Sequence, residues 1–366
     1  KRIESCNLPT TLRLRLVYVF AYVAVVLTPM SLSKMVTWIF ASKDPMAEKH
    51  WKTWSHALLT MGAVWSASAG IALLAGDSMQ APSDDEGIVR ASVWRKRGMM
   101  LGAYLATLVA ARARDNGPIA LYEFPWACNV SMMLTVLGLV LPKQRPNLVG
   151  AAMASCCADQ VFWYVDFLSY ALTGKFVVGV AGYMVWPQTS LVTKLTSLHH
   201  LWFIPFIAAY ISEQSGTVPP ATVPPLLLTK EGGAVTKPGR ASGPAALPAT
   251  AVARTPGAFN AKTSYTLSMC GVVVCSILSR IMTPYEVWSP KLQAIKYMNV
   301  NLSYEMWRDV KLKLLHVLDG VHPIIFTPAL LVFYNFINGP IYVALLAGLA
   351  ALRRRAGSRL SRKLAF

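Results

Sequence analysis

Apolar runs of about 20 residues recur along most of this chain, and they constrain its fold more than any other feature. Two of them are "WSHALLTMGAVWSASAGIALLA" at 54–75 and "SYTLSMCGVVVCSILSRIM" at 264–282. Each is long enough to cross about 30 Å of hydrocarbon as a helix. Only 14% of the 366 residues are charged, whereas about 25% is usual in soluble proteins. The sequence therefore predicts an integral membrane protein.

The apolar runs contain glycine and proline and do not alternate between apolar and polar residues, so they predict helices rather than strands. The predicted class is an all-α polytopic helical membrane protein with about eight transmembrane helices, and nine are possible. The ninth depends on Asn338-Gly339-Pro340, which leaves the last run open as one long kinked helix or two. Eight helices place most basic residues on one side of the membrane, which favours that count. The predicted helices cover 13–36, 54–75, 98–113, 121–141, 148–173, 191–211, 264–282 and 314–352.

The chain divides into four parts by composition. Residues 1–212 hold the first six predicted helices, and 264–352 hold the last two with a polar loop between them. Residues 213–263 are rich in Pro, Ala, Gly and Thr and cannot bury enough apolar surface to fold alone, so they form a linker or a partner-bound arm. Residues 353–366 form a basic C-terminal tail.

The formal net charge of +18 bears on partners and location. Basic residues flanking helices fix topology and meet anionic phospholipid, so membrane lipids are predicted partners and bound phospholipid is expected. Nucleic acid is not a predicted partner, because the sequence offers no soluble basic domain. The basic balance and the first residue, Lys1, favour a removed organellar presequence, which predicts the mitochondrial inner membrane as the location.

Ionisable residues inside apolar runs are candidate sites, because each costs several kcal/mol at membrane depth unless paired or hydrated. "SLHHLWFIPF" places His199 and His200 side by side in the sixth helix. Adjacent helical residues point about 100° apart, so only one imidazole is expected to face a given partner. The predicted polar intramembrane centre consists of Asn129, Asp166 and one of the two histidines. It suits proton transfer or base catalysis, but interhelical hydrogen bonding alone is the favoured interpretation.

Cofactor and nucleophile signals are weak. Six cysteines occur without a CxxC pair, and they indicate small buried residues rather than disulfides or a zinc site, so no metal is predicted. The histidines have no spacing typical of haem ligation, and no cofactor is predicted. Cys128 has no base beside it in the sequence, which argues against a nucleophile. Phosphate-binding, HExxH and GxSxG motifs are absent from the sequence.

Four stretches carry a resemblance: "CNVSMMLTVLGLVL", "WYVDFLSYALTGKFVVGVAGYM", "LTSLHHLWFIP" and "MNVNLSYE". Over residues 124–340 the chain resembles a family of uncharacterised bacterial polytopic integral membrane proteins. The resemblance implies a fold rather than an activity, and it makes the Pro/Ala-rich arm look like an insertion. It favours Asp166 and His200 over Asp159 and His199. The positions that it singles out are Asp166, Gly174, Tyr183, Met184, Ser197, His200, Pro205, Asn299, Asn301 and Tyr304.

Two functions from different classes follow. The favoured one is a non-catalytic accessory (supernumerary) membrane subunit of a large organellar inner-membrane complex of the mitochondrial respiratory type, with other subunits as partners. Its support is the arm, the basic tail and the lack of a catalytic signature. The alternative is a stand-alone membrane enzyme or transporter for a lipid or small solute, acting through Asn129, Asp166 and His200. A water-accessible cavity at these residues would favour the alternative, and a dry, fully paired centre would favour the subunit.

Overall fold

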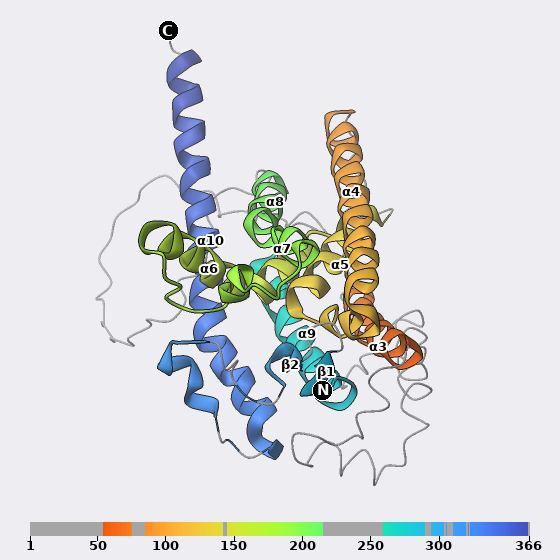
Figure 1. The fold of residues 1–366 in the computed structure, drawn as a ribbon. Coiled ribbons are helices and arrows are strands. Elements are labelled where there is room, and N and C mark those ends of the chain that lie inside the picture. Colours follow the sequence, from red (N-terminus) through yellow and green to blue (C-terminus); the bar gives the residue numbers. More distant parts are fainter. Residues whose placement is uncertain are drawn as a thin grey trace, which may run out of the picture.

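The computed structural model describes residues 54–74, 85–141, 145–214, 259–289, 294–303, 305, 310–319, 321 and 323–364. The predicted helix at 13–36 and nearly all of the predicted arm at 213–263 lie outside these residues. The described part is a bundle of helices with a small β-hairpin at one end (Figure 1). The prediction of a helical membrane protein therefore holds at the level of its class.

The α-helices are α3 (Trp54–Leu74), α4 (Asp85–Asn116), α5 (Ala127–Val140), α6 (Pro146–Thr173), α7 (Leu191–Ser197), α8 (His199–Gln214), α9 (Ala261–Met282) and α10 (Pro323–Leu364). Short connections join α4 to α5, α5 to α6 and α7 to α8, whereas longer stretches of chain separate α8 from α9 and α9 from α10. Shorter 3-10 turns lie at η1 (Gly117–Glu123), η2 (Gly182–Val185), η4 (Val300–Leu302) and η5 (Lys313–Leu318). The hairpin pairs β1 (Glu286–Ser289) with β2 (Ala294–Tyr297) in antiparallel register, and the all-α prediction did not anticipate it.

Several helices are long and apolar enough to cross a membrane. Among the described residues there are four such segments, in α6, in α7 with α8, in α9, and over Pro328–Arg355 of α10. A fifth is added if Gly87–Glu123 and Ala127–Val140, which meet at 90°, form one broken span. These helices support an integral membrane protein, whereas the predicted eight spans are not confirmed.

Two predicted helices differ in length from those in the structure. The expected helix at 98–113 is the central part of the 32-residue α4, whose first turns lie beyond the apolar run. The run at 314–352 contains η5 and then a single helix, α10, that continues through Pro340. Asn338 explains part of this continuity, because its Oδ1 accepts a hydrogen bond of 3.1 Å from the Ala158 backbone N–H of α6. Contact with α6 thus holds α10 across the sequence that suggested a break.

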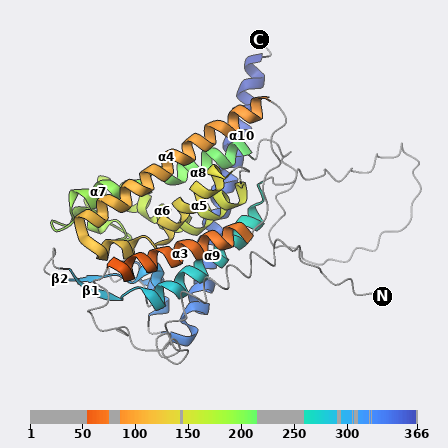
Figure 2. The ribbon, with the colours of Figure 1, turned by 90° about the vertical axis from the view of Figure 1, so that its right-hand side faces the viewer.

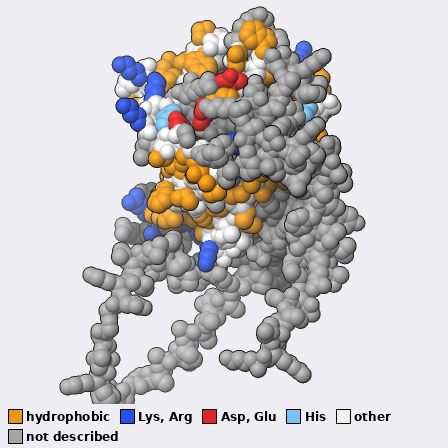
Figure 3. Space-filling view, turned by 90° about the horizontal axis from the view of Figure 1, so that it is seen from below, with side chains coloured by type: hydrophobic (Ala, Val, Ile, Leu, Met, Phe, Trp, Pro, Cys, Tyr) orange, Lys and Arg blue, Asp and Glu red, His pale blue; other side chains and the backbone are white. Residues whose placement is uncertain are grey.

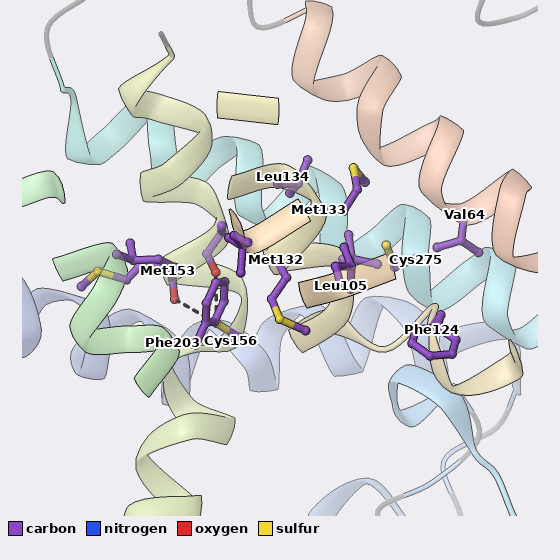
Figure 4. Close-up of a cluster of buried hydrophobic side chains, with 14 of the residues drawn as sticks. Val64, Leu105, Phe124, Met132, Met133, Leu134, Met153, Cys156, Phe203 and Cys275 are labelled. Atoms are coloured by element: carbon purple, nitrogen blue, oxygen red, sulfur yellow. Dashed lines mark hydrogen bonds between the residues drawn. The ribbon is translucent and has the colours of Figure 1, made fainter. Parts of the chain in front are cut away.

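Helix α6 is the centre of the bundle, with α5, α8, α9 and α10 packed around it (Figure 2). Its first half consists largely of small residues, which allow neighbouring helices to approach closely. A Cβ added at Gly150 would lie 2.4 Å from Ser264 Oγ of α9. Figure 4 shows Met132, Met153 and Phe203 meeting at the contact of α5, α6 and α8. Lipid tails are as apolar as the side chains, so the hydrophobic effect does not drive these helices together. Van der Waals contact between closely packed small residues does so instead.

The outer surface carries large apolar side chains. Leu172 and Phe336, for example, are 75% and 77% exposed. Figure 3 shows hydrophobic side chains gathered in broad patches on one face, with basic side chains near the edges of that face. Such a surface is costly in water and suits contact with lipid tails.

Candidate functional site

The start of α5 is held by a distant loop. Asn301 of η4 accepts a hydrogen bond of 2.8 Å from the Ala127 backbone N–H, and its own amide donates to the Pro125 carbonyl at 2.7 Å. These contacts fix the turn between η1 and α5, where the chain changes direction by 90°. Cys128 is the second residue of α5, so its thiol lies at the helix N-terminus, where unpaired N–H groups favour negative charge.

The two histidines lie where a helix is interrupted. Helix α7 ends at Ser197, Leu198 forms a turn, and α8 begins at His199. The ring centroids of His199 and His200 are 4.1 Å apart, and an imidazole nitrogen of each lies within 4.8 Å of the Cys128 sulfur. Both rings therefore lie near the Cys128 sulfur, although both residues belong to the first turn of α8, whereas the sequence led us to expect only one ring to face a given partner.

Hydrogen bonds orient both imidazoles. His199 Nδ1 lies 2.7 Å from the Thr196 carbonyl oxygen, which only accepts, so Nδ1 carries the proton and Nε2 carries a lone pair. His199 is 2% exposed, and its Nε2 has no hydrogen-bond partner among the described residues. His200 Nδ1 lies 2.6 Å from the Gln160 side-chain amide, and its ring stacks on Trp163 at 4.3 Å. A buried, unpaired lone pair is thus held beside a thiol.

A buried ion cluster lies next to this group. Arg112 binds Glu123 at 2.7 Å, and Lys296 of β2 binds the other oxygen of the same carboxylate. The Arg112 guanidinium also donates to Thr196 Oγ1 at 2.9 Å and to Ser197 Oγ at 2.8 Å, which ties α4 to the start of the histidine segment. Two cations and one anion leave a formal charge of +1.

This charge acts on the thiol and the imidazoles. Arg112 interacts electrostatically with Cys128, His199 and His200. A positive charge held in a low-dielectric interior favours a nearby thiolate or oxyanion and opposes a second cation. Arg112 therefore favours a thiolate at Cys128, whereas burial and the Asp159 carboxylate favour the neutral thiol, which needs a base to remove its proton. We name Cys128, His199 and His200, with Arg112 behind them, the thiol–imidazole centre.

An apolar cavity of about 70 Å³ adjoins this centre. Helices α3, α5, α6 and α9 supply most of its walls, and Cys128 and Asp159 are among its few polar groups. A second cavity, also of about 70 Å³, shares Asp159 and Tyr334 with the first and is bounded by α6 and α10. The walls of the first cavity include Ser68, Trp126, Val130, Leu134, Leu148, Ala151, Ser155, Leu267, Gly271, Val272, Cys275, Asn301 and Leu302. Since His199 Nε2 has no hydrogen-bond partner among the described residues, the side chains of the centre are not fully paired.

The predicted member Asp166 has another set of partners. Its two carboxylate oxygens accept backbone N–H groups of Val178, Gly179 and Ala181 at 2.8 to 3.0 Å. It therefore anchors the loop that follows α6. The carboxylate beside His200 belongs to Asp159, one of whose oxygens lies 3.8 Å from His200 Nδ1.

Asn129, also predicted for the centre, follows Cys128 on α5. Its amide donates to the Glu123 carbonyl at 2.8 Å, while its Oδ1 is buried and has no hydrogen-bond partner in the described part of the chain. The centre in the structure thus keeps both predicted histidines and adds Cys128, which the sequence analysis had argued against as a nucleophile, and Arg112, which it had not placed there. The sequence hinted at the buried ion cluster only in that Arg112 and Glu123 lie at the ends of apolar runs.

Several residues singled out by the resemblance shape turns around the centre. Gly174 ends α6 at φ +70°, while Asn299 and Asn301 also have positive φ, which asparagine tolerates better than most residues. The Tyr183 hydroxyl donates to Ser197 Oγ at 2.9 Å. Burial of Tyr183 raises its pKa, so this hydroxyl stays protonated and keeps donating. Tyr304 lies outside the described residues.

The chemistry of the centre fits two uses. A thiol beside a neutral imidazole fits a nucleophile with a general base, and a sulfur with two nitrogens also fits a transition-metal ion. The predictions of no metal, no haem and no other cofactor remain predictions.

Comparison with known proteins adds no relative: no protein-family model matches the chain, and no curated protein or solved structure is significantly similar to it. The resemblance to bacterial membrane proteins therefore remains a prediction.

Proposed function

We propose that the protein is a membrane enzyme that transfers or hydrolyses acyl groups through a thioester on Cys128. The observation that carries this proposal is the meeting of the Cys128 sulfur and the two imidazoles within 4.8 Å beside an apolar cavity. It develops the alternative drawn from the sequence, a membrane enzyme acting on a lipid.

His199 is the general base in this proposal. Its Nε2 carries a lone pair, is buried, and is held in place by the bond from Nδ1–H to the Thr196 carbonyl. A base must reach the proton that it removes, and in the absence of substrate such distances are often longer than a hydrogen bond. An imidazole nitrogen of His199 lies within 4.8 Å of the Cys128 sulfur, so side-chain rotations can bring the thiol to the ring.

The reaction balances with these groups alone. His199 takes the thiol proton, and the Cys128 thiolate attacks the carbonyl carbon of an acyl ester. The C–O bond to the leaving alcohol breaks, and that alcohol takes the proton from the imidazolium. In the second half, His199 deprotonates an acceptor alcohol or water, which attacks the thioester and returns the thiolate. Arg112 stabilises the anionic species in both halves by its charge.

The side chains that line the cavity indicate which chemical group of a substrate can bind there. Its walls are mainly aliphatic side chains of the bundle, with few hydrogen-bonding groups. A hydrocarbon chain gains by leaving water for such walls, whereas a sugar or a nucleotide would lose hydrogen bonds there. A cavity of about 70 Å³ holds only the first few carbons of such a chain, so we infer as the substrate a lipid acyl ester whose carbonyl end enters the cavity.

The test is acylation of the purified chain in detergent. We would incubate it with an alkyne-tagged palmitoyl thioester and measure label that neutral hydroxylamine removes. We expect labelling of the wild type, none above background in Cys128→Ala, and slower labelling in His199→Asn.

The matched control is Cys270→Ser, because Cys270 is exposed and lies on α9. This variant is expected to label at the wild-type rate. Equal labelling of wild type and Cys128→Ala would refute the proposal.

The accessory-subunit prediction stays open, because its main support, the arm at 213–263, lies almost wholly outside the described residues. The mitochondrial location and the partner subunits likewise remain proposals. Native-gel migration after mild detergent extraction, with mass spectrometry of co-migrating proteins, tests all three. A stable assembly of many subunits would support them, and a monomer or small homo-oligomer would count against them.

A further inference from the structure

We propose that Cys128, His199 and His200 also form a binding site for Zn²⁺, and that zinc bound there blocks the thiol. The inhibition rests on the function proposed above, whereas zinc binding itself does not. The sequence predicted no metal site, because the residues that meet here come from separate helices.

The ligand atoms have the right elements and nearly the right spacing. Zinc binds thiolate sulfur at about 2.3 Å and imidazole nitrogen at about 2.0–2.1 Å in a tetrahedral arrangement. Tetrahedral angles place such ligand atoms about 3.4–3.6 Å apart. The three atoms lie within 4.8 Å of one another, so rotations that move each by about 1 Å close the site around an ion.

His199 is oriented as a metal ligand usually is. A coordinating histidine commonly donates its other ring N–H to a carbonyl or carboxylate, which fixes the tautomer. His199 does so to Thr196 and leaves Nε2 buried without a hydrogen-bond partner in the described chain. Burying an unpaired polar atom is unfavourable, and a coordinated cation would satisfy it.

His200 is restrained by contacts of a different kind, because the Gln160 side-chain N–H donates to its Nδ1. Gln160 lies 2.6 Å from its Nδ1, and Trp163 stacks on its ring at 4.3 Å. As placed, this hydrogen bond leaves the ring proton on Nε2. Turning the Gln160 amide brings its Oε1, which has no hydrogen-bond partner among the described residues, to accept from Nδ1–H, and this leaves the Nε2 lone pair for the ion. A site with both imidazoles restrained loses little side-chain entropy when the ion binds.

Charge balance also permits the ion. The net positive cluster around Arg112 would repel a bare dication. The Cys128 thiolate and the Asp159 carboxylate, which lies 3.8 Å from His200 Nδ1 and lines the same cavity, together supply two negative charges. A bound cation favours the ionised form of this carboxylate, which burial otherwise disfavours, so the two charges offset those of zinc, and the fourth ligand is a water in the cavity.

The donor set selects among cations. Magnesium and calcium prefer oxygen ligands, so two nitrogens and a sulfur disfavour them. Zinc combines affinity for thiolate and imidazole with a lack of redox chemistry. A zinc-bound thiolate shares its lone pair with the metal, so Cys128 cannot attack an acyl group while the ion is present.

The experiment uses the purified full-length chain in detergent, first stripped with a chelator. Zinc retained after dialysis is measured by elemental analysis, and Co²⁺ replaces zinc as a spectroscopic probe. We expect about one site per chain that requires Cys128, with a sulfur-to-cobalt charge-transfer band in the wild type. That band tests sulfur ligation without any substitution, so misfolding of a variant cannot obscure it.

Variants then assign the ligands. Cys128→Ser removes the charge-transfer band, and His199→Asn and His200→Asn weaken zinc binding. Gln160→Leu weakens it about 10–100-fold, as is typical when a partner of a ligating histidine is lost. The matched control Cys270→Ser binds as the wild type does. Zinc retention that is unchanged in Cys128→Ser, or a wild-type cobalt complex without the band, overturns the proposal.

The zinc-binding and acylation experiments distinguish the metal site from the enzyme function. Zinc binding without any thioester labelling upholds the metal site and removes the proposed enzyme function. Labelling of a chain that binds no zinc keeps the enzyme and removes the metal site. Labelling that persists at full rate in the zinc-loaded protein refutes the inhibition.

Discussion

Asp166→Asn separates a structural role from a catalytic one at a residue that the sequence placed in the polar centre. The carboxylate receives four hydrogen bonds of 2.8 to 3.0 Å from three backbone N–H groups, two at each oxygen. Asparagine replaces one oxygen with a donor that would face the N–H groups of Gly179 and Ala181. A hydrogen bond to a charged group is worth about 1.5–3 kcal/mol, so losing two costs about 3–6 kcal/mol. We expect the loop after α6 to open locally at that cost.

Hydrogen exchange measured by mass spectrometry checks this expectation at residues 176–181. Exchange of these amides is expected to quicken by at least a factor of about 100, because each 1.4 kcal/mol is a factor of ten in the opening equilibrium. Thioester labelling of Cys128 is expected to continue.

The control is Asp159→Asn, because Asp159 makes no hydrogen bond to that loop among the described residues, lies beside His200 and lines the cavity. It should leave exchange in the loop unchanged and alter labelling. Unchanged loop exchange in Asp166→Asn, or loss of labelling with the loop intact, would refute the assignment of Asp166 as an anchor.

Three further predictions concern packing, charge and pH. Gly150→Ala should destabilise the protein by about 1–3 kcal/mol, because the new methyl group would collide with α9. The control Gly271→Ala should not, because Gly271 has open space around it. Thermal unfolding in detergent measures both variants. Glu123→Gln leaves two cations of the buried cluster without their carboxylate and should cost about 3–5 kcal/mol, measured in the same assay. The pKa of His316 is raised, first by its hydrogen bond to the Val310 carbonyl and then by Asp319, so its contribution to stability is present below about pH 6.5 and lost as pH rises through the raised pKa. A pH titration of its ring by NMR should show a lower pKa in Asp319→Asn, and an unchanged value would contradict the pairing.

The membrane class and most helices could be predicted from the sequence, because the length and apolar content of a run set whether it can cross a bilayer. The runs at 54–75, 148–173 and 264–282 end within a few residues of α3, α6 and α9. Helix ends and interruptions were less predictable. Pro340 does not end α10, since contacts of Asn338 with α6 support the helix there.

The candidate site was predictable only in part. Ionisable residues in apolar runs are costly, so the histidine pair stood out from the sequence alone. Which groups meet the pair depends on a break at Leu198 and on the turn before α5 held by Asn301, and neither has a local signature. The sequence by itself determined a helical membrane protein with buried histidines. Only the packing of α5, α6 and α8 decided that Cys128 and Asp159, rather than Asp166, lie beside them, because contacts between helices depend on rotation and register that periodicity does not specify.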